Sequence, residues 1–386
     1  MDLTAAADWT FPVPIHYGPG RVKELPEICR RNGMTKPLLV TDRGSRDLPF
    51  IGEIMRSLTD AELSPRLFAE ISPNPTDVEV TAGQQVFERE GCDGVLAVGG
   101  GSGMDGGKAI SLVVGKRKPL WTFDFDLPPG DPEGSFTPLV CVPTTAGTGA
   151  ETESTAMITD TSRGIKGCVW HPAQKPRAAV LDPALTVGLP PKLTAWTGCD
   201  ALVHAIEAYC VDAWHPMCDG IALEAMGLIA ASLEPAVRQP ADLTARGGML
   251  AGSCLAGVSF LKGLGLVHAI SHMVGAAFDT HHGLTNAIVL PAVLRFNEPA
   301  IASKVPEMCA ALGVADRSFS GLHRHICKLL DNLEIPRSLA EIGVTADTAA
   351  DLAVKASKDS CAVTNPRPAS VQEIEALIRE AVSGTR

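Results

Sequence analysis

Short apolar runs alternate with stretches of helical spacing in the first half of the chain. The runs cover residues 37–41, 94–98 and 139–142, and residues 78–90 repeat apolar positions with a helical period. Strands that alternate with helices predict a parallel sheet covered by helices. Because ligands of such sheets bind at the carboxyl ends of the strands, the polar turns that follow the three runs are candidate binding loops.

The pattern changes after residue 188, where the run Gly188-Leu189-Pro190-Pro191 interrupts any regular element. Beyond it the apolar spacing is helical in eight segments, residues 201–209, 220–233, 243–258, 288–295, 301–312, 322–333, 348–358 and 371–382. A chain of 386 residues is long enough for two cores. We therefore predict an α/β N-terminal domain with a parallel sheet over residues 1–188 and an all-α C-terminal domain over residues 189–386.

The turn after the second apolar run is rich in glycine. Its sequence, Gly99-Gly100-Gly101-Ser102, precedes a helical pattern that contains Asp105 and Lys108. Consecutive glycines let backbone N–H groups approach a pyrophosphate, and a helix N-terminus adds its positive dipole end. A glycine run can also be no more than a flexible turn, but the order strand, glycines, helix favours phosphate binding. The spacing GGGSxxDxxK differs from the GxGxxG pattern of ordinary dinucleotide folds.

Two other polar turns are candidate cofactor contacts. Asp42 follows the first run, where a carboxylate can accept hydrogen bonds from a ribose and repel a 2′-phosphate. A solvated turn aspartate explains the residue equally well. The turn after the third run contains Thr144, Thr145 and Thr148, whose hydroxyl groups can bond ribose or phosphate, although such loops often have no ligand. If Asp42 binds the ribose, the cofactor is NAD and not NADP.

Histidines concentrate in the second half of the chain. Asp200 and His204 are four residues apart in a helical stretch, so they project from one face, and His268 and His272 repeat this spacing before His281-His282. An isolated histidine is usually structural, but two such pairs in one helical domain favour a divalent metal site. One carboxylate and several imidazoles suit iron or zinc. The spacing alone does not choose among the four histidines of this region, and by itself it nominates His268 and His272.

Composition excludes several classes of protein. The formal net charge of −11 opposes binding to nucleic acid. Eleven cysteines without a regular framework are typical of a reducing cytoplasm, and the N-terminus lacks the features of a secretory signal. We find no stretch that approaches the roughly 18 uncharged apolar residues of a membrane span and expect no membrane association.

Taken in order, these motifs resemble the iron-containing (group III) alcohol dehydrogenase family. The resemblance covers practically the whole chain and includes the glycine loop, Pro143-Thr144-Thr145-Ala146-Gly147-Thr148, the stretches from Thr197 to His204 and from Gly265 to His272, His282-Gly283 and Asn365-Pro366-Arg367. It implies a dinucleotide-binding N-terminal domain, a metal-binding C-terminal domain, an active site in the cleft between them, and a homodimer or higher homo-oligomer.

The resemblance also implies roles for individual residues. Four positions match metal ligands: Asp200, His204, His268 and His282. His272 then becomes a candidate for proton transfer near the nicotinamide. Ten positions match cofactor contacts: Asp42, Gly99, Gly100, Gly101, Ser102, Asp105, Thr144, Thr145, Thr148 and Lys166. Cys361 matches a position that lines the substrate cavity.

One departure from the family is a loop one residue shorter before Gly263-Leu264-Gly265, which contains Lys262. We hypothesise that Lys262 presents a cation to the substrate. The commoner alternative is a solvated loop lysine without a specific role.

The sequence therefore predicts an NAD-dependent, metal-dependent oxidoreductase that interconverts a primary alcohol and its aldehyde by hydride transfer, with Fe²⁺ or alternatively Zn²⁺. One alternative is a metal-free reductase of an unsaturated oxo acid, as in maleylacetate reductases, which retention of all four ligand positions disfavours. Another is a dehydroquinate-synthase-like lyase, whose phosphorylated substrate would need a basic pocket that the second half does not offer. A non-catalytic metal-binding protein is the third.

Overall fold

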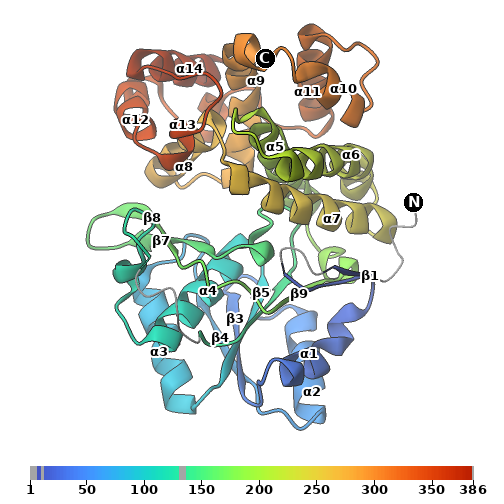
Figure 1. Cartoon of the computed structure of the whole chain (residues 1–386), viewed down its shortest axis with the longest axis vertical. Helices are drawn as coiled ribbons and strands as arrows, with labels where there is room; N and C mark the ends of the chain where they lie inside the picture. Colours follow the sequence, from blue (N-terminus) through green and yellow to red (C-terminus); the bar gives the residue numbers. More distant parts are fainter. Residues whose placement is uncertain (1–6, 10–12, 130–135, 385–386) are drawn as a thin grey trace. The chain divides into compact units, whose positions relative to one another are not determined.

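The computed structural model describes residues 7–9, 13–129 and 136–384. The chain divides into two compact units, of which unit 1 comprises Met1–Thr145 and Ala150–Gly188 and unit 2 comprises Ala146–Gly149 and Leu189–Arg386 (Figure 1). Four residues of the second polar turn, residues 146–149, therefore belong to the unit formed by the second half of the chain. Each unit has its own hydrophobic core.

Unit 1 is built on a seven-stranded sheet with the order β1-β2-β9-β6-β5-β3-β4. Its strands are β1 (Ala7–Trp9), β2 (Ile15–Tyr17), β3 (Pro37–Asp42), β4 (Arg66–Ile71), β5 (Gly94–Gly99), β6 (Leu139–Pro143) and β9 (Ala178–Leu181). All neighbouring pairs are parallel except β1 with β2. The predicted parallel α/β domain is confirmed, and the three apolar runs are β3, β5 and β6.

Helices cover both faces of this sheet, which explains why its central strands are apolar throughout. Successive side chains point to opposite faces: Leu96 and Val98 pack with α1 (Leu25–Arg31) and α2 (Pro49–Asp60), whereas Val95 and Ala97 pack with α3 (Asp77–Glu90) and α4 (Gly101–Lys116) (Figure 1). Every residue of β5 is buried. The glycine loop between β5 and α4 therefore starts from a rigid strand.

The chain after β6 forms a hairpin that the apolar pattern did not predict. Strands β7 (Thr155–Asp160) and β8 (Ile165–Trp170) pair antiparallel as a separate two-stranded sheet. Within its described residues, the first half also contains four short 3₁₀ helices: η1 (Arg21–Glu24), η2 (Leu120–Phe123), η3 (Ala150–Thr152) and η4 (Pro183–Thr186).

Unit 2 is helical in its described residues, as predicted. Its α-helices are α5 (Pro191–Cys210), α6 (Pro216–Arg238), α7 (Leu243–Ser259), α8 (Leu266–Phe278), α9 (His282–Ile301), α10 (Val305–Ala311), α11 (Phe319–Asn332), α12 (Ala349–Ala356), α13 (Ser360–Val363) and α14 (Val371–Ser383). The 3₁₀ helices are η5 (Phe260–Lys262), η6 (Leu339–Ile342) and η7 (Ala346–Thr348). The predicted bounds were too narrow for α5. The prediction of one helix over residues 301–312 was wrong, because α9 ends at Ile301 and α10 begins only at Val305.

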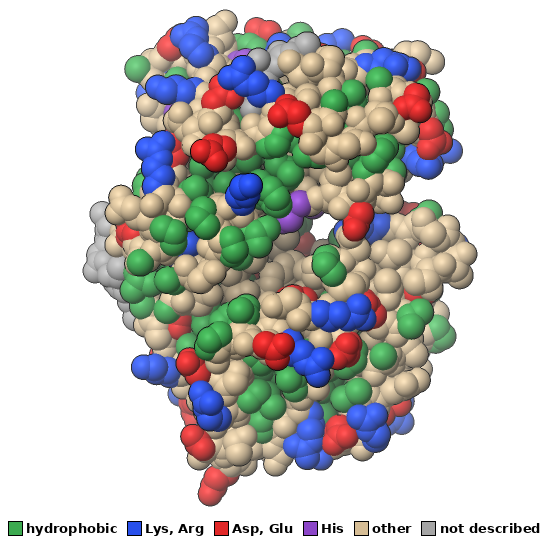
Figure 2. Space-filling view, turned by 180° about the vertical axis from the view of Figure 1, so that it is seen from behind, with side chains coloured by type: hydrophobic (Ala, Val, Ile, Leu, Met, Phe, Trp, Pro, Cys, Tyr) green, Lys and Arg blue, Asp and Glu red, His purple; other side chains and the backbone are tan. Residues whose placement is uncertain are grey.

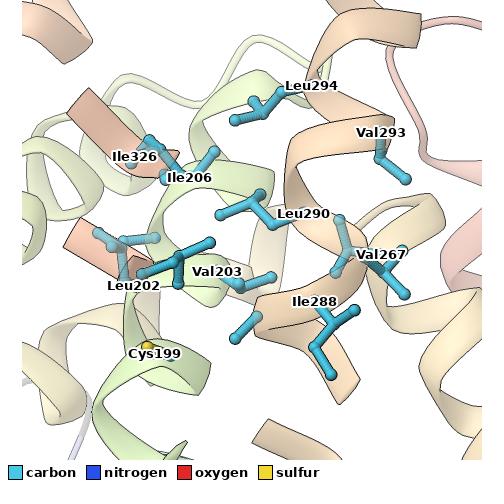
Figure 3. Close-up of a cluster of buried hydrophobic side chains, with 14 of the residues drawn as sticks. Cys199, Leu202, Val203, Ile206, Val267, Ile288, Leu290, Val293, Leu294 and Ile326 are labelled. Atoms are coloured by element: carbon cyan, nitrogen blue, oxygen red, sulfur yellow. The ribbon is translucent and has the colours of Figure 1, made fainter. Parts of the chain in front are cut away.

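Helix α5 lies at the centre of the unit 2 core and is buried on all sides from Gly198 to Cys210. Figure 3 shows Leu202, Val203 and Ile206 of α5 among buried side chains that include Leu290 of α9 and Val267 of α8. Val203 and Val267 directly precede His204 and His268 in the sequence. Dense packing of these neighbours holds the candidate metal ligands on rigid helices.

Among the described residues, one helix, α6, is long and apolar enough by length and composition to cross a membrane, or two if the bent pair Leu243–Lys262 and Leu266–Phe278 is counted as one span. The expectation concerned about 18 uncharged apolar residues, and α6 contains Asp219, Glu224 and Glu234, so this helix does not contradict it. Core helices of globular units meet the same test, and α6 buries Ala222, Met226, Ile229 and Leu233 in the core of unit 2. The expected absence of membrane association stays a prediction.

Candidate metal centre and cofactor loops

Unit 2 brings together the four residues that the family resemblance assigned to the metal. One potential ligand atom from each of Asp200, His204, His268 and His282 lies within 4.8 Å of the others. The Nε2 atoms of His282 and His268 are 3.5 Å and 3.9 Å from Oδ1 of Asp200. Three of the residues are buried, and the side chain of His282 is 33% exposed. The cluster thus offers a carboxylate and three imidazoles as donors.

Three helices supply these residues. Asp200 and His204 lie one turn apart on α5, His268 is in the first turn of α8, and His282 is the first residue of α9. Gly283 allows α9 to begin against α5, because a Cβ atom at this position would lie 2.3 Å from the carbonyl oxygen of Trp196. The sequence contains the His-Gly pair, but the reason for the glycine is visible only in the packing.

Asn286 is a member of the cluster that sequence reasoning missed. Its Nδ2 donates to Oδ1 of Asp200 at 2.7 Å and lies 3.2 Å and 3.1 Å from Nε2 of His268 and His282. A carboxylate only accepts hydrogen bonds, so the amide nitrogen of Asn286 faces the cluster. An NH₂ group has two hydrogens, so beside Asp200 it can donate to one of the two Nε2 atoms at a time. The spacing of four residues from His282 was the only signal for Asn286 in the sequence.

Burial and charge keep the candidate ligands in the states that a metal requires. Burial lowers the pKa of His204 and places the pKa of His268 well below its usual value, so these imidazoles are neutral. Burial alone would raise the pKa of Asp200, but His204, His282 and Asn286 hold it below the usual value. Nδ1 of His204 is buried and has no hydrogen-bond partner among the described residues. The donor set and its protonation fit a divalent metal such as iron or zinc.

His272 belongs to a second group and does not join the four candidate ligands. Ligand atoms of His272, Asp359 and Cys361 lie within 4.8 Å of one another, and Nδ1 of His272 is 2.9 Å from Oδ2 of Asp359. The ring of His272 stacks on that of His282, with centroids 5.4 Å apart and planes inclined by 13°. The pair His268 and His272 that helical spacing nominated is therefore divided between two groups.

Cys361 is half-buried at the start of α13 and donates its backbone N–H to Oδ1 of Asp359 at 2.9 Å. Burial raises the pKa of its thiol well above the usual value, and Asp359 and Glu207 add to this rise. The thiol is therefore protonated beside His272, and the predicted role in the substrate cavity stays a prediction.

Lys262 is neither a solvated loop lysine nor a free cation. Its side chain is 1% exposed, and Nζ contacts Oδ1 of Asp219 and the carbonyl oxygen of Tyr209. Lys304 donates to the same carbonyl at 2.8 Å and to that of Val211 at 2.7 Å. Two lysines thus bind the carbonyl groups at the C-terminus of α5, where helix dipoles favour cations. This ion pair opposes the hypothesis that Lys262 presents its charge to a substrate.

The glycine loop of unit 1 lies beside Asp42. Gly99 ends β5 with φ of 151°, a conformation that favours glycine, and a Cβ atom there would lie 3.2 Å from Oδ2 of Asp42. Gly100 is then the N-cap of α4, which begins at Gly101. The carboxylate of Asp42 accepts hydrogen bonds from the backbone and hydroxyl of Ser45 at 2.9 Å and 2.8 Å. Asp42 and the glycines thus share the carboxyl edge of β3 and β5, where a dinucleotide would bind.

The threonine turn contributes to the same edge. Thr144 donates its backbone N–H to the carbonyl of Gly99 at 2.9 Å, and a Cβ atom at Gly100 would lie 3.2 Å from Cγ2 of Thr145. Ser102 donates its hydroxyl to the carbonyl of Pro73 at 2.8 Å. Thr148 lies in the segment that belongs to unit 2. Their predicted cofactor contacts stay predictions.

Asp105 and Lys108 connect α4 to the chain that follows β6. Lys108 is buried and donates to the carbonyl of Ala150 at 2.8 Å, and Asp105 accepts the backbone N–H of Met157 at 3.2 Å. Burial raises the pKa of Asp105, although Lys108 opposes this rise. Both side chains therefore connect α4, which follows the glycine loop, to residues 150–157. Lys166, on β8, donates to Oδ1 of Asn74 at 3.3 Å.

One unit of the chain is a parallel α/β sheet with a glycine loop, and the other is helical and carries the cluster of one aspartate and three histidines. This combination defines a class of metal-dependent oxidoreductases. A family model described as iron-containing alcohol dehydrogenase matches residues 12–183, and one described as the C-terminal part of the Fe-containing alcohol dehydrogenase family matches residues 194–382. The chain therefore belongs to the iron-containing alcohol dehydrogenase family, which confirms the resemblance.

Individual relatives match over nearly their full length. The chain is 37% identical over 376 residues to the NAD-dependent methanol dehydrogenase of Bacillus methanolicus, covering 95% of this chain and 97% of the relative. It is 35% identical over 383 residues to the 1,3-propanediol dehydrogenase of Klebsiella pneumoniae, covering 97% and 98%. The solved structure of a 1,3-propanediol oxidoreductase has a TM-score of 0.91 at 34% identity and covers 99% of this chain and 100% of its own. The predicted enzyme class, an NAD-dependent iron-type alcohol dehydrogenase, is confirmed at the level of the family.

Proposed function

We propose that this protein interconverts a primary alcohol and its aldehyde by hydride transfer with NAD, using a divalent metal held by Asp200, His204, His268 and His282. The observation that carries the proposal is the cluster itself, whose four ligand atoms lie within 4.8 Å of one another. The two relatives named above act on methanol and on 1,3-propanediol, which are both primary alcohols. The metal is Fe²⁺ in this proposal, with Zn²⁺ as the alternative that the same donors accept.

A metal bound there supplies a Lewis acid that polarises the alcohol or carbonyl oxygen, and NAD accepts or donates the hydride. Asp200 and the three histidines fix the position of that cation. His272 holds or releases the proton of the hydroxyl group, oriented by Asp359 through the 2.9 Å contact. Asp42 accepts hydrogen bonds from the adenosine ribose and so selects NAD.

The presence of all four ligands favours this function over the metal-free reduction of an oxo acid. A dehydroquinate-synthase-like lyase would need cations for a phosphorylated substrate, and Lys262, the candidate cation that we had placed near the substrate, is paired with Asp219. These contacts support a neutral alcohol or aldehyde as the substrate.

We further propose that the protein is cytoplasmic, acts as a homodimer or higher homo-oligomer, and binds neither nucleic acid nor membranes. All eleven cysteines lie in the described residues and are free thiols, which supports a reducing compartment. Figure 2 shows acidic and basic side chains interspersed on the face that it displays, in a chain of net charge −11. Such a surface does not favour a phosphate backbone.

The test is a screen of alcohols and aldehydes with NAD(H) and NADP(H). The protein is stripped of metal with a chelator and then reloaded with Fe²⁺ or Zn²⁺. We expect turnover of primary alcohols with NAD that disappears on stripping and returns on reloading. Turnover that survives complete removal of metal contradicts the metal-dependent function, and activity confined to oxo acids supports the alternative reductase.

A further inference from the structure

Glu207 is a buried carboxylate that none of the roles above uses. It lies on α5, three residues after His204, and is 5% exposed. Its Oε1 accepts the backbone N–H of Val267 at 2.7 Å, and its Oε2 accepts that of His268 at 3.4 Å. Both amides belong to the first turn of α8. A carboxylate in this position satisfies N–H groups that the helix cannot bond internally and complements the positive end of the helix dipole.

Glu207 also contacts the side chain of a candidate metal ligand. Oε2 of Glu207 is 2.6 Å from Nδ1 of His268, whose side chain is 1% exposed. The other ring nitrogen, Nε2, lies on the side of Asp200 and Asn286. The imidazole of His268 is therefore held between an outer carboxylate and the metal cluster.

The two ring nitrogens of His268 have different partners. The carboxylate of Asp200 accepts from Nδ2 of Asn286, so this amide group presents N–H to its neighbours. Nε2 of His268 lies 3.2 Å from the same nitrogen, whereas Nδ1 lies 2.6 Å from Oε2 of Glu207. With a metal held at Nε2, the ring proton would lie on Nδ1, where Oε2 of Glu207 is the acceptor 2.6 Å away.

We propose that Glu207 is a positioning residue for the metal site, which fixes the tautomer and the orientation of His268 and thereby increases the affinity for the metal. The inference rests on the proposed function. Carboxylate partners of this kind make a histidine a better ligand, and their removal commonly weakens metal binding about 10–100-fold.

The backbone is adapted to this contact at Gly265. A Cβ atom at position 265 would lie 2.7 Å from Oε1 of Glu207, which is shorter than the contacts that Cβ atoms make in proteins. Gly265 directly precedes α8, so its lack of a side chain lets the carboxylate reach the first amides of the helix. A larger residue at 265 would displace Glu207 from His268.

The test compares Glu207→Gln with Asn365→Ala. Glutamine keeps the size of the side chain, and its carbonyl can still accept the amide of Val267. Its NH₂ group then faces Nδ1 of His268, which favours the tautomer with the proton on Nε2 and removes the lone pair from the metal. Asn365 is the matched control, because its Oδ1 accepts the N–H of Leu266 at 3.1 Å at the same end of α8.

The readouts are the dissociation constant for Zn²⁺ in competition with a chelator, and the visible spectrum of the Co²⁺-loaded protein. We expect Glu207→Gln to bind Zn²⁺ about 10–100-fold more weakly with an altered Co²⁺ spectrum, and Asn365→Ala to resemble the wild type in both. Wild-type affinity for Zn²⁺ in Glu207→Gln overturns the inference. An equal loss of affinity in both variants also overturns it, because Glu207 would then act only by capping the N-terminus of α8. A wild-type protein that binds no divalent metal contradicts the proposed function instead, and this outcome is distinct from the other two.

Discussion

The imidazole of His272 is hydrogen-bonded to Asp359, with Nδ1 and Oδ2 2.9 Å apart, while its ring stacks on the candidate ligand His282. Asp359 lies at the N-terminus of α13, where its other oxygen accepts the N–H of Cys361. The carboxylate is therefore fixed on both sides. It orients His272 beside the metal cluster without making it a ligand.

This arrangement predicts that His272→Ala lowers kcat but leaves the metal in place. Loss of a positioned proton-transfer group commonly reduces the rate about 10²–10⁴-fold. Metal content measured by mass spectrometry should equal that of the wild type. Loss of the metal in this variant would indicate that His272 is a ligand. An unchanged kcat would contradict its role in proton transfer.

For the metal ligands, we predict that His282→Ala loses bound metal and activity, whereas His281→Ala retains the metal. The two histidines are adjacent, but the ring of His281 packs on Trp196 with centroids 5.0 Å apart, and only His282 joins the cluster. The metal-to-protein ratio after dialysis distinguishes the two variants. Equal retention in both would contradict the assignment of His282.

For the cofactor, we predict that Asp42→Asn raises kcat/KM for NADP relative to NAD. Removal of the carboxylate removes its repulsion of the 2′-phosphate, worth roughly 1 kcal/mol or more at about 4 Å, so the ratio should change at least about fivefold. Asp47→Asn is the control, because Asp47 is an exposed acidic residue five positions along the chain. A similar change in both variants would show a general charge effect.

For the ion pair of Lys262, we predict that Asp219→Ala destabilises the protein more than Lys262→Met. The first substitution leaves a buried ammonium group without its carboxylate, which costs up to about 3–5 kcal/mol, whereas the second leaves a carboxylate that is 30% exposed. Urea unfolding measures the difference. The ratio of kcat/KM for anionic and neutral aldehydes should be unchanged in Lys262→Met, and a selective loss for anionic aldehydes would revive the substrate hypothesis.

For Glu153 in unit 1, we predict a pH-dependent effect on stability. Burial raises its pKa from 4.5 to about 8, although Lys108 and Thr155 oppose this rise, and its Oε1 has no hydrogen-bond partner among the described residues. The folded state therefore keeps a proton between about pH 4.5 and 8 that the unfolded chain releases, so stability falls as pH rises through this range.

Glu153→Gln should reduce that pH dependence, because the amide keeps the shape of the protonated carboxyl without titrating. Urea midpoints between pH 5 and 8 would measure it, with the exposed Glu53→Gln as control. Identical slopes for the wild type and Glu153→Gln would contradict the predicted protonation.

The sequence by itself determined the fold class, because periods of two and of 3.6 residues depend only on local order. The runs that became β3, β5 and β6 had to be buried on both faces, and glycines after β5 marked the candidate cofactor loop. The hairpin of β7 and β8 was missed, since its exposed and half-buried positions carry little apolar signal.

Only the tertiary structure decided how the histidines are divided. Helical spacing placed Asp200 with His204 and also His268 with His272, but a helix turn fixes neighbours on one helix and not contacts between helices. The packing of α9 against α5 at Gly283 places His282 beside Asp200. His272 contacts Asp359 instead and stays outside the cluster of candidate ligands. The partners of Lys262 and Glu207 were also decided by the tertiary structure, because they lie 43 and 61 residues away in the sequence.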